Sequence, residues 1–113
     1  MSDIKQEKAK KFAIKIFKLS KYLSDKKEFI ISKQILRSGF SIGANLAEAE
    51  FAQSKDDFIH KISISLKEAN ETKYWLEILF ETSQIPQELF VDTVNDCKEI
   101  ISILVAVLKK LKN

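Results

Sequence analysis

The stretch QILRSGFSIGANL, from Gln34 to Leu46, holds both glycines of the 113-residue chain. Gly39 and Gly43 are four residues apart, so on a helix they lie one above the other on the same face. Glycine costs a helix interior roughly 1 kcal/mol relative to alanine. Two glycines in an otherwise helical pattern therefore predict that a second backbone approaches this face closely. A loop or kink near Gly39 is the alternative interpretation.

The sequence on both sides of this stretch spaces its apolar residues by three and four, which is typical of amphipathic helices. With only two glycines and one proline in the chain, the pattern predicts an all-α protein with one domain over residues 1–113. The expected fold is an antiparallel up-and-down four-helix bundle. The four helices are expected at about Ile4–Leu23, from a start near Asp25 to Ala52, at about Lys55–Ser83, and from Pro86 onward.

Polar residues mark the expected helix starts. Asp25 with Glu28 resembles a capping box that opens the second helix, and Ser54 with Asp57 repeats the signal for the third. Pro86 fits the first turn of the fourth helix, where its missing N–H is not needed.

Two of the expected helices have clear core stripes. The stripe of the first helix is Ala9, Phe12, Ile16, Leu19 and Leu23, and that of the fourth is Phe90, Val94, Cys97, Ile101, Leu104, Leu108 and Leu111. Cys97 lies within such a stripe, which favours a small buried hydrophobe over a reactive thiol.

Composition sets the outer limits. A chain that is 45% hydrophobic at this length can bury one core but not two. Its single cysteine excludes an internal disulfide and fits a reducing cytoplasm. The longest strongly apolar run, Ile100 to Leu108, is well short of the roughly 20 residues that span a bilayer.

Several helices carry more apolar surface than one core needs. A helix that is apolar on two faces is usually buried on two faces, and large exposed apolar patches mark interfaces. The sequence therefore predicts a homo-oligomer. The expected interface residues are Gly39, Gly43, Ile64, Trp75, Ile78, Ile100, Ile103 and Val107.

Positive charge is concentrated at the start of the chain. Residues 1–27 contain nine Lys and three acidic residues, whereas residues 28–113 contain ten basic and thirteen acidic ones. A homo-oligomer would multiply this charge, and such a field attracts phosphate backbones without reading sequence. The alternative is a solvated face, or one that pairs with acids of a neighbouring chain. The expected nucleic-acid-binding residues are Lys8, Lys11, Lys15, Lys18 and Arg37.

A polar stripe crosses the glycine-containing helix and continues on the third helix. These residue types could form a ligand site or a satisfied network that fixes the register of an interface. The stripe consists of Arg37, Ser38, Ser41, Asn45 and Glu48, with Asn70 and Glu71 on the third helix.

The stretch ILRSGFSIGANLAEAEFAQSKDDF at residues 35–58, followed by HKISISLKEANETKYWLEIL at residues 60–79, resembles a bacterial four-helix-bundle family. That family includes the proteins encoded by intervening sequences of large-subunit ribosomal RNA genes. Accessory proteins of diversity-generating retroelements form a more distant branch. The resemblance implies a ring, a homopentamer, and an association with RNA. Lys73 departs from the family pattern, in which this position is usually acidic.

Enzymatic functions find little support in the sequence. His60 is the only histidine, whereas a di-iron bundle needs two such motifs and further carboxylates. The GFSIGA stretch lacks the strand context of a nucleophile elbow. We therefore expect no enzyme activity, no cofactor and no bound metal.

The expected function is that of a ring-forming accessory protein that binds the backbone of RNA or DNA through the lysines of its first helix. A protein-interaction scaffold, whose lysines only keep the ring in solution, is the alternative.

Overall fold

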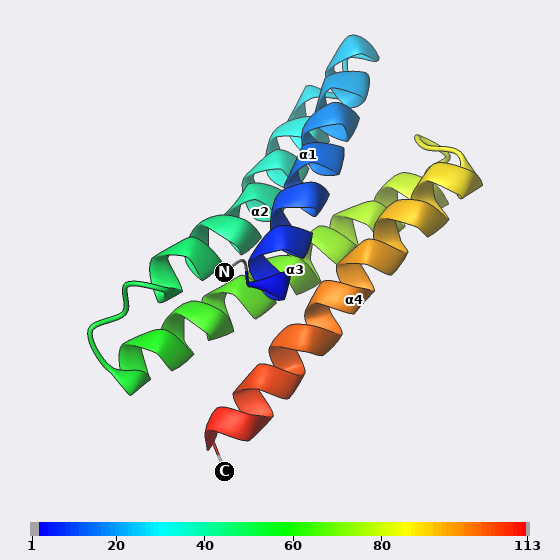
Figure 1. Ribbon diagram of the computed structural model, residues 1–113. Helices are drawn as coiled ribbons and strands as arrows, with labels where there is room; N and C mark the ends of the chain where they lie inside the picture. Colours follow the sequence, from blue (N-terminus) through cyan, green and yellow to red (C-terminus); the bar gives the residue numbers. More distant parts are fainter. Residues whose placement is uncertain (1–2, 113) are drawn as a thin grey trace.

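The computed structural model describes residues 3–112 and contains four helices (Figure 1). Residues 3–112 include no β-strand, so the all-α fold predicted from the sequence is confirmed. No helix in this range is both long and apolar enough to cross a bilayer. The helices are α1 (Ile4–Asp25), α2 (Phe29–Ala49), α3 (Lys55–Glu81) and α4 (Gln87–Lys112).

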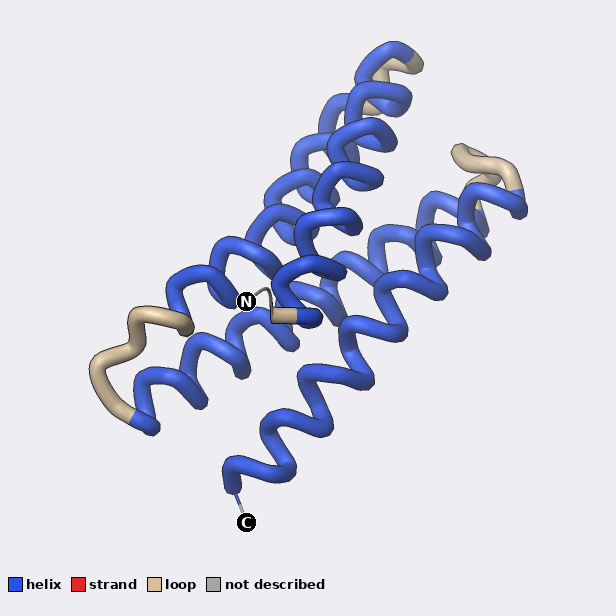
Figure 2. The backbone as a smooth tube through the Cα atoms, in the orientation of Figure 1, coloured by secondary structure: helices blue, strands red, loops and turns tan. Residues whose placement is uncertain are grey.

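Each helix packs against the next one in the chain, and α4 also contacts α1. Figure 1 shows two side-by-side pairs, α1 with α2 and α3 with α4, which cross and diverge toward the ends that carry the α1–α2 and α3–α4 connections. Figure 2 shows that the connections between the helices are short. The contact between α1 and α4 is the least extensive of the four, so these two helices border the more open side of the molecule.

The predicted start of α3 is confirmed. Ser54 is the N-cap, and its hydroxyl accepts a hydrogen bond of 3.0 Å from the backbone N–H of Asp57. The Asp57 carboxylate accepts in return from the backbone N–H of Gln53 at 3.1 Å. Pro86 directly precedes α4, and its carbonyl accepts from the N–H of Phe90.

The capping box predicted at Asp25 and Glu28 is wrong. Asp25 is the last residue of α1, and Glu28 precedes α2 without a side-chain capping bond. The backbone N–H of Glu28 instead donates to the carbonyl of Leu23 at 2.9 Å, while Lys27 adopts a φ of 65°. This hydrogen bond and the left-handed residue are typical of a helix C-terminal cap. Residues 25–28 therefore cap the end of α1 rather than the start of α2.

The predicted core of α1 is confirmed, because all five residues of its stripe are buried. In α4 the core is displaced toward a neighbouring row. Val94, Cys97 and Leu104 are buried as expected, but Ile101 is only partly buried and Ile100 is 2% exposed. The expectation that Ile100 faces a second chain is therefore wrong, since this side chain belongs to the core of its own chain.

The two glycines lie where α2 meets α1. A Cβ atom on Gly39 would be 2.8 Å from Cγ2 of Ile16, and one on Gly43 would be 3.5 Å from Cβ of Ala9. The close helix approach predicted from the glycine pair is confirmed, and α2 continues through both residues without a break. Gly39 is buried against its own chain, so its predicted place in an interface between chains is not supported.

Candidate functional site

Of the four lysines of α1 predicted to bind nucleic acid, two form ion pairs within the chain. These four are Lys8, Lys11, Lys15 and Lys18. Lys8 Nζ lies 2.7 Å from Oε1 of Glu99, and Lys15 Nζ lies 2.9 Å from Oδ2 of Asp92 and also bonds Asp96. The hydrogen bonds from Asp96 and Asp92 raise the pKa of Lys15 above its ordinary value. Lys8 and Lys15 thus bridge α1 to acids of α4 in the same chain.

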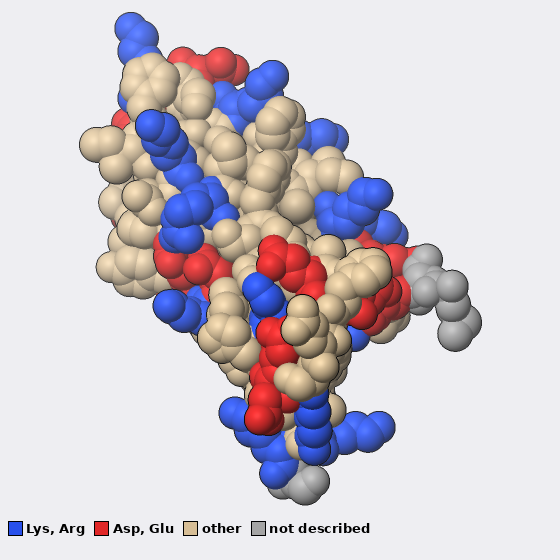
Figure 3. Space-filling view, turned by 90° about the vertical axis from the view of Figure 1, so that its left-hand side faces the viewer, with Lys and Arg blue, Asp and Glu red and all other residues tan. Residues whose placement is uncertain are grey.

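Lys11 and Lys18 are exposed and form no ion pair within residues 3–112. Lys10 and Lys21, on another side of α1, are also exposed and unpaired in this range. Figure 3 shows the side of the molecule that lies on the left in Figure 1, and both basic and acidic side chains occur on it. The available positive charge is therefore a set of separate lysines along α1.

Arg37 lies on α2 and contacts α3, whereas Lys8 and Lys15 of α1 contact α4. Its guanidinium binds Glu68 Oε2 at 3.1 Å and also pairs with Glu71. Glu71 accepts a further hydrogen bond of 3.0 Å from Nε1 of Trp75. The Trp75 hydrogen bond and then Arg37 lower the pKa of Glu71 below its usual value, against the effect of burial. Arg37 is therefore already paired with two carboxylates. The structure does not place it next to the lysines of α1.

The predicted polar stripe separates into a buried part and a surface part. Thr72 Oγ1 lies 2.8 Å from Oγ of buried Ser38 and joins α3 to α2. Ser41, Asn45 and Asn70 hydrogen-bond carbonyls one turn back in their own helices, and Glu48 pairs with Lys61. Within residues 3–112 no buried side-chain polar atom lacks a partner. Part of the stripe therefore joins α2 to α3, and the rest bonds the backbone of its own helix.

Ser65 and Thr72 also bond α3 to α2, which the sequence pattern did not predict. Both are fully buried, and the Ser65 hydroxyl donates to the carbonyl of Ile42 at 2.8 Å. Ser20 and Ser32 form a similar pair between α1 and α2, with hydroxyl oxygens 2.7 Å apart. These buried hydroxyl groups could have been predicted from the sequence, because they are small polar residues at core positions of the 3.6-residue helical period.

The remaining predicted interface residues are partly exposed. They are Gly43, Ile64, Trp75, Ile78, Ile103 and Val107. The structure adds apolar side chains that the sequence analysis did not single out, and Ile30 and Phe51 are each 83% exposed. Apolar surface is therefore spread over several faces of the chain.

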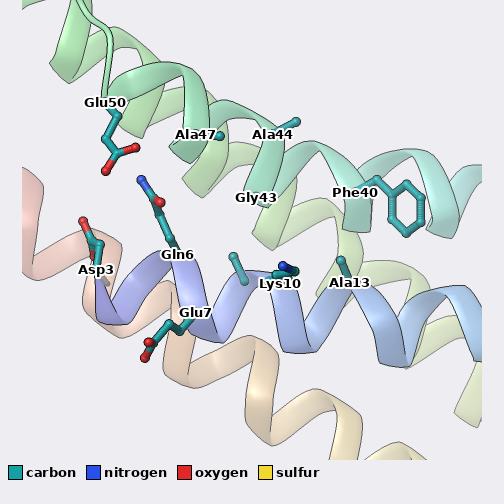
Figure 4. A pocket seen from close by; sticks show the side chains of 11 residues that line it. Asp3, Gln6, Glu7, Lys10, Ala13, Phe40, Gly43, Ala44, Ala47 and Glu50 are labelled. Carbon is teal, nitrogen blue, oxygen red and sulfur yellow. The ribbon is translucent and has the colours of Figure 1, made fainter. Parts of the chain in front are cut away.

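A groove of about 600 Å³ runs between α1 and α2 (Figure 4). Its floor is made of small residues from both helices. Phe40 lies at one end and stacks on Phe17 with ring centroids 6.4 Å apart. Glu7 and Glu50 lie at the other end. The small residues of the floor are Ala9, Ala13, Gly43, Ala44 and Ala47.

Cys97 is buried, and its Sγ donates to the carbonyl of Ala69 at 3.2 Å. Burial raises the pKa of this thiol to about 12. His60 is exposed. Residues 3–112 contain no group of three or more His, Cys, Asp or Glu side chains placed to hold a metal ion.

Comparison with known proteins identifies a family and a solved structure that resemble the chain. Residues 4–106 match the family described as 23S rRNA-intervening sequence protein. The crystal structure of a protein with unknown function from the S23 ribosomal protein family of Bacteroides thetaiotaomicron is 52% identical in sequence, with a TM-score of 0.91. The match covers 93% of this chain and 98% of that one. No curated protein matches the chain.

Proposed function

The chain belongs to the family of 23S rRNA-intervening sequence proteins, and from this premise we propose that it is a non-enzymatic accessory protein that binds the backbone of RNA or DNA. The family resemblance predicted from residues 34–79 is confirmed by the match over residues 4–106. The proposed binding surface is the lysine-rich side of α1, and the proposed compartment is the cytoplasm.

The observation that carries this proposal is the set of α1 lysines without an acidic partner. Lys11 and Lys18 are exposed and unpaired within the described part of the chain. A lysine already bonded to a carboxylate must give up that pair before it binds phosphate, whereas an unpaired lysine releases only counterions and water. Lys11 and Lys18 are therefore the main proposed contacts, and Lys8, Lys15 and Arg37 are secondary.

We further propose that the chain is an up-and-down bundle that assembles into a homopentameric ring. The short connections between successive helices support the up-and-down order. The partly exposed apolar residues of α3 and α4 support assembly, because a helix with apolar residues on two faces is usually buried on two faces. A ring repeats each α1 once per subunit, so a modest number of lysines per chain gives a larger positive field.

Two double variants with the same change of charge test the binding surface. Lys11→Gln with Lys18→Gln removes two unpaired lysines, and Lys8→Gln with Lys15→Gln removes two paired ones. Glutamine preserves helix propensity. Fluorescence anisotropy with a structured RNA and with duplex DNA at about 50 mM salt, where phosphate contacts are strong, should show a clearly greater loss of affinity for the first variant. Equal affinity of the first variant and the wild type would exclude Lys11 and Lys18 as the main contacts.

The second candidate function is a protein-interaction scaffold without a nucleic-acid ligand. The pairing of Lys8 with Glu99 and of Lys15 with Asp92 favours it, because these lysines already have a role in joining α1 to α4. A scaffold would show no binding to RNA or DNA even at low salt. It would instead retain its protein partner in the Lys11→Gln/Lys18→Gln variant.

A further inference from the structure

The C-terminal half of α4 has an apolar row that its own chain leaves partly exposed. Ile103, Val107 and Leu111 follow one another at steps of four, which places them on one ridge of the helix, and all three are only partly buried. Figure 2 shows the last turns of α4 extending beyond the start of α1. In Figure 3 the corresponding end of the molecule is a narrow projection with basic side chains near its tip.

The groove between α1 and α2 has the complementary features. Ala44 and Ala47 are exposed on its floor and Gly43 is partly exposed, so the backbone of another helix can come close. Glu7 of α1 and Glu50, which directly follows α2, both line one end of the groove. In Figure 4 Glu50 points toward α1, whereas Glu7 lies at the edge of the groove, on the side of α1 away from α2. Neither carboxylate has an ion pair within residues 3–112. Lys10 also lines the groove, but the acidic residues Asp3, Glu7 and Glu50 outnumber it, so the charged lining is mainly acidic.

The α4 of the same chain does not fill this groove. Helix α4 packs against α3 and α1, and it makes no packing contact with α2 in the described part of the chain. The row of Lys8 and Lys15, which faces α4, lies on a different side of α1 from the groove residues Gln6 and Ala13. A helix in the groove must therefore come from another molecule.

We propose that the groove between α1 and α2 of one subunit receives the C-terminal half of α4 from a second copy of this chain. The ridge of Ile103 and Val107 packs onto the alanine and glycine floor. The basic end, Lys109, Lys110 and Lys112, lies at the acidic end of the groove beside Glu7 and Glu50. This inference rests on the proposed ring and specifies the contact that builds it.

The contact is heterologous, because the ridge and the groove are different surfaces of the chain. Each subunit then has one free groove and one free ridge until the last subunit closes the assembly. Heterologous contacts give rings when the rotation between subunits closes and filaments when it does not. The proposed contact therefore fits a ring and excludes an isologous dimer.

Charge-reversal variants provide the test, with mass measured by light scattering after gel filtration. The groove variant is Glu7→Lys with Glu50→Lys, and the helix variant is Lys109→Glu with Lys110→Glu. Each should raise the concentration needed for assembly at least about tenfold, because like charges then face one another across the contact. One chain carrying all four changes restores opposite charges and should assemble again.

A steric variant tests the apolar part of the same contact. Ala47→Glu places a long charged side chain on the groove floor and should yield smaller species. Gln34→Glu, at an exposed position on another side of α2, introduces the same side chain and is the matched control, which should assemble like the wild type. Circular dichroism melting of Ala47→Glu and of Gln34→Glu checks that both are folded. For the charge-reversal variants, the recovery of assembly in the four-change chain excludes misfolding as the cause.

The outcomes separate this contact from the ring itself. A wild-type chain that stays monomeric at micromolar concentration overturns both proposals. A wild-type assembly that persists unchanged in the groove, helix and Ala47→Glu variants overturns this contact and leaves the ring, which must then use another surface. Disruption by either double variant with recovery in the four-change chain supports the contact.

Discussion

At the scale of single residues, the space around each glycine decides its role. Gly39 and Gly43 share a face of α2, but only Gly39 lies against a rigid neighbour. The Ile16 atom that a Cβ on Gly39 would meet at 2.8 Å is a branch methyl of a fully buried side chain. The spacing of the glycines predicted a close approach, but it could not rank the two positions, because the rank depends on how α1 packs onto α2.

A matched pair of alanine variants tests this difference. Gly39→Ala should lower the free energy of unfolding by about 1–3 kcal/mol through overpacking, reduced in part by the better helix propensity of alanine. Gly43→Ala meets Ala9 at an ordinary contact distance of 3.5 Å and should be neutral or stabilising by up to about 1 kcal/mol. Urea denaturation measures both, and equal stability of the two variants would contradict the packing described for Gly39.

Burial also determines the chemistry of Cys97. With a pKa of about 12, the folded thiol should react with a thiol reagent at pH 8 only when the chain unfolds, so the labelling rate should rise steeply in urea. In the unfolded chain the thiol ionises near the ordinary cysteine pKa of 9.0. The unfolded state therefore binds fewer protons between these two pKa values, and the thiol contributes a fall in stability as pH rises through this window. Fast labelling of the folded protein would show that Cys97 is accessible.

At the scale of helices, periodicity predicted which segments are helical but not how they end. The stripe of α1 and the cap at Ser54 follow from local sequence, and both are confirmed. The ends of α1 and α3 use Lys27 and Ser83 at φ values of 65° and 59°. Lysine and serine rarely adopt this conformation, which usually falls to glycine. Because neither position is a glycine, the sequence did not indicate where α1 and α3 end.

Substitutions at these caps have opposite expected effects. Ser83→Gly removes the strain of a side chain in the left-handed region and should stabilise the fold by roughly 1 kcal/mol. Ser54→Ala removes the hydroxyl that accepts from Asp57 and should cost about 1 kcal/mol. Thermal unfolding of both variants measures the effects. A lower melting temperature for Ser83→Gly would contradict the C-terminal geometry assigned to α3.

At the scale of the whole molecule, the packing of the helices determines which basic residues form ion pairs. Lys8 and Glu99, like Arg37 and Glu68, are far apart in the sequence and meet only because of the way the helices pack. A charge pattern on one helix cannot reveal such partners, so the sequence predicted five equivalent basic residues, of which the described part of the chain leaves Lys11 and Lys18 unpaired. The groove between α1 and α2 could not be predicted from the sequence either, because it forms only where the faces of two helices meet.

We propose that this protein binds nucleic acid through the charge of its α1 lysines. The most direct measurement is the affinity of the wild-type protein for a structured RNA as a function of salt. If six or more phosphates are neutralised across the assembly, affinity should fall by on the order of 10³ or more between 50 and 200 mM salt, with little dependence on base sequence. Absence of binding at 50 mM, or an affinity that salt leaves unchanged, would contradict the claim.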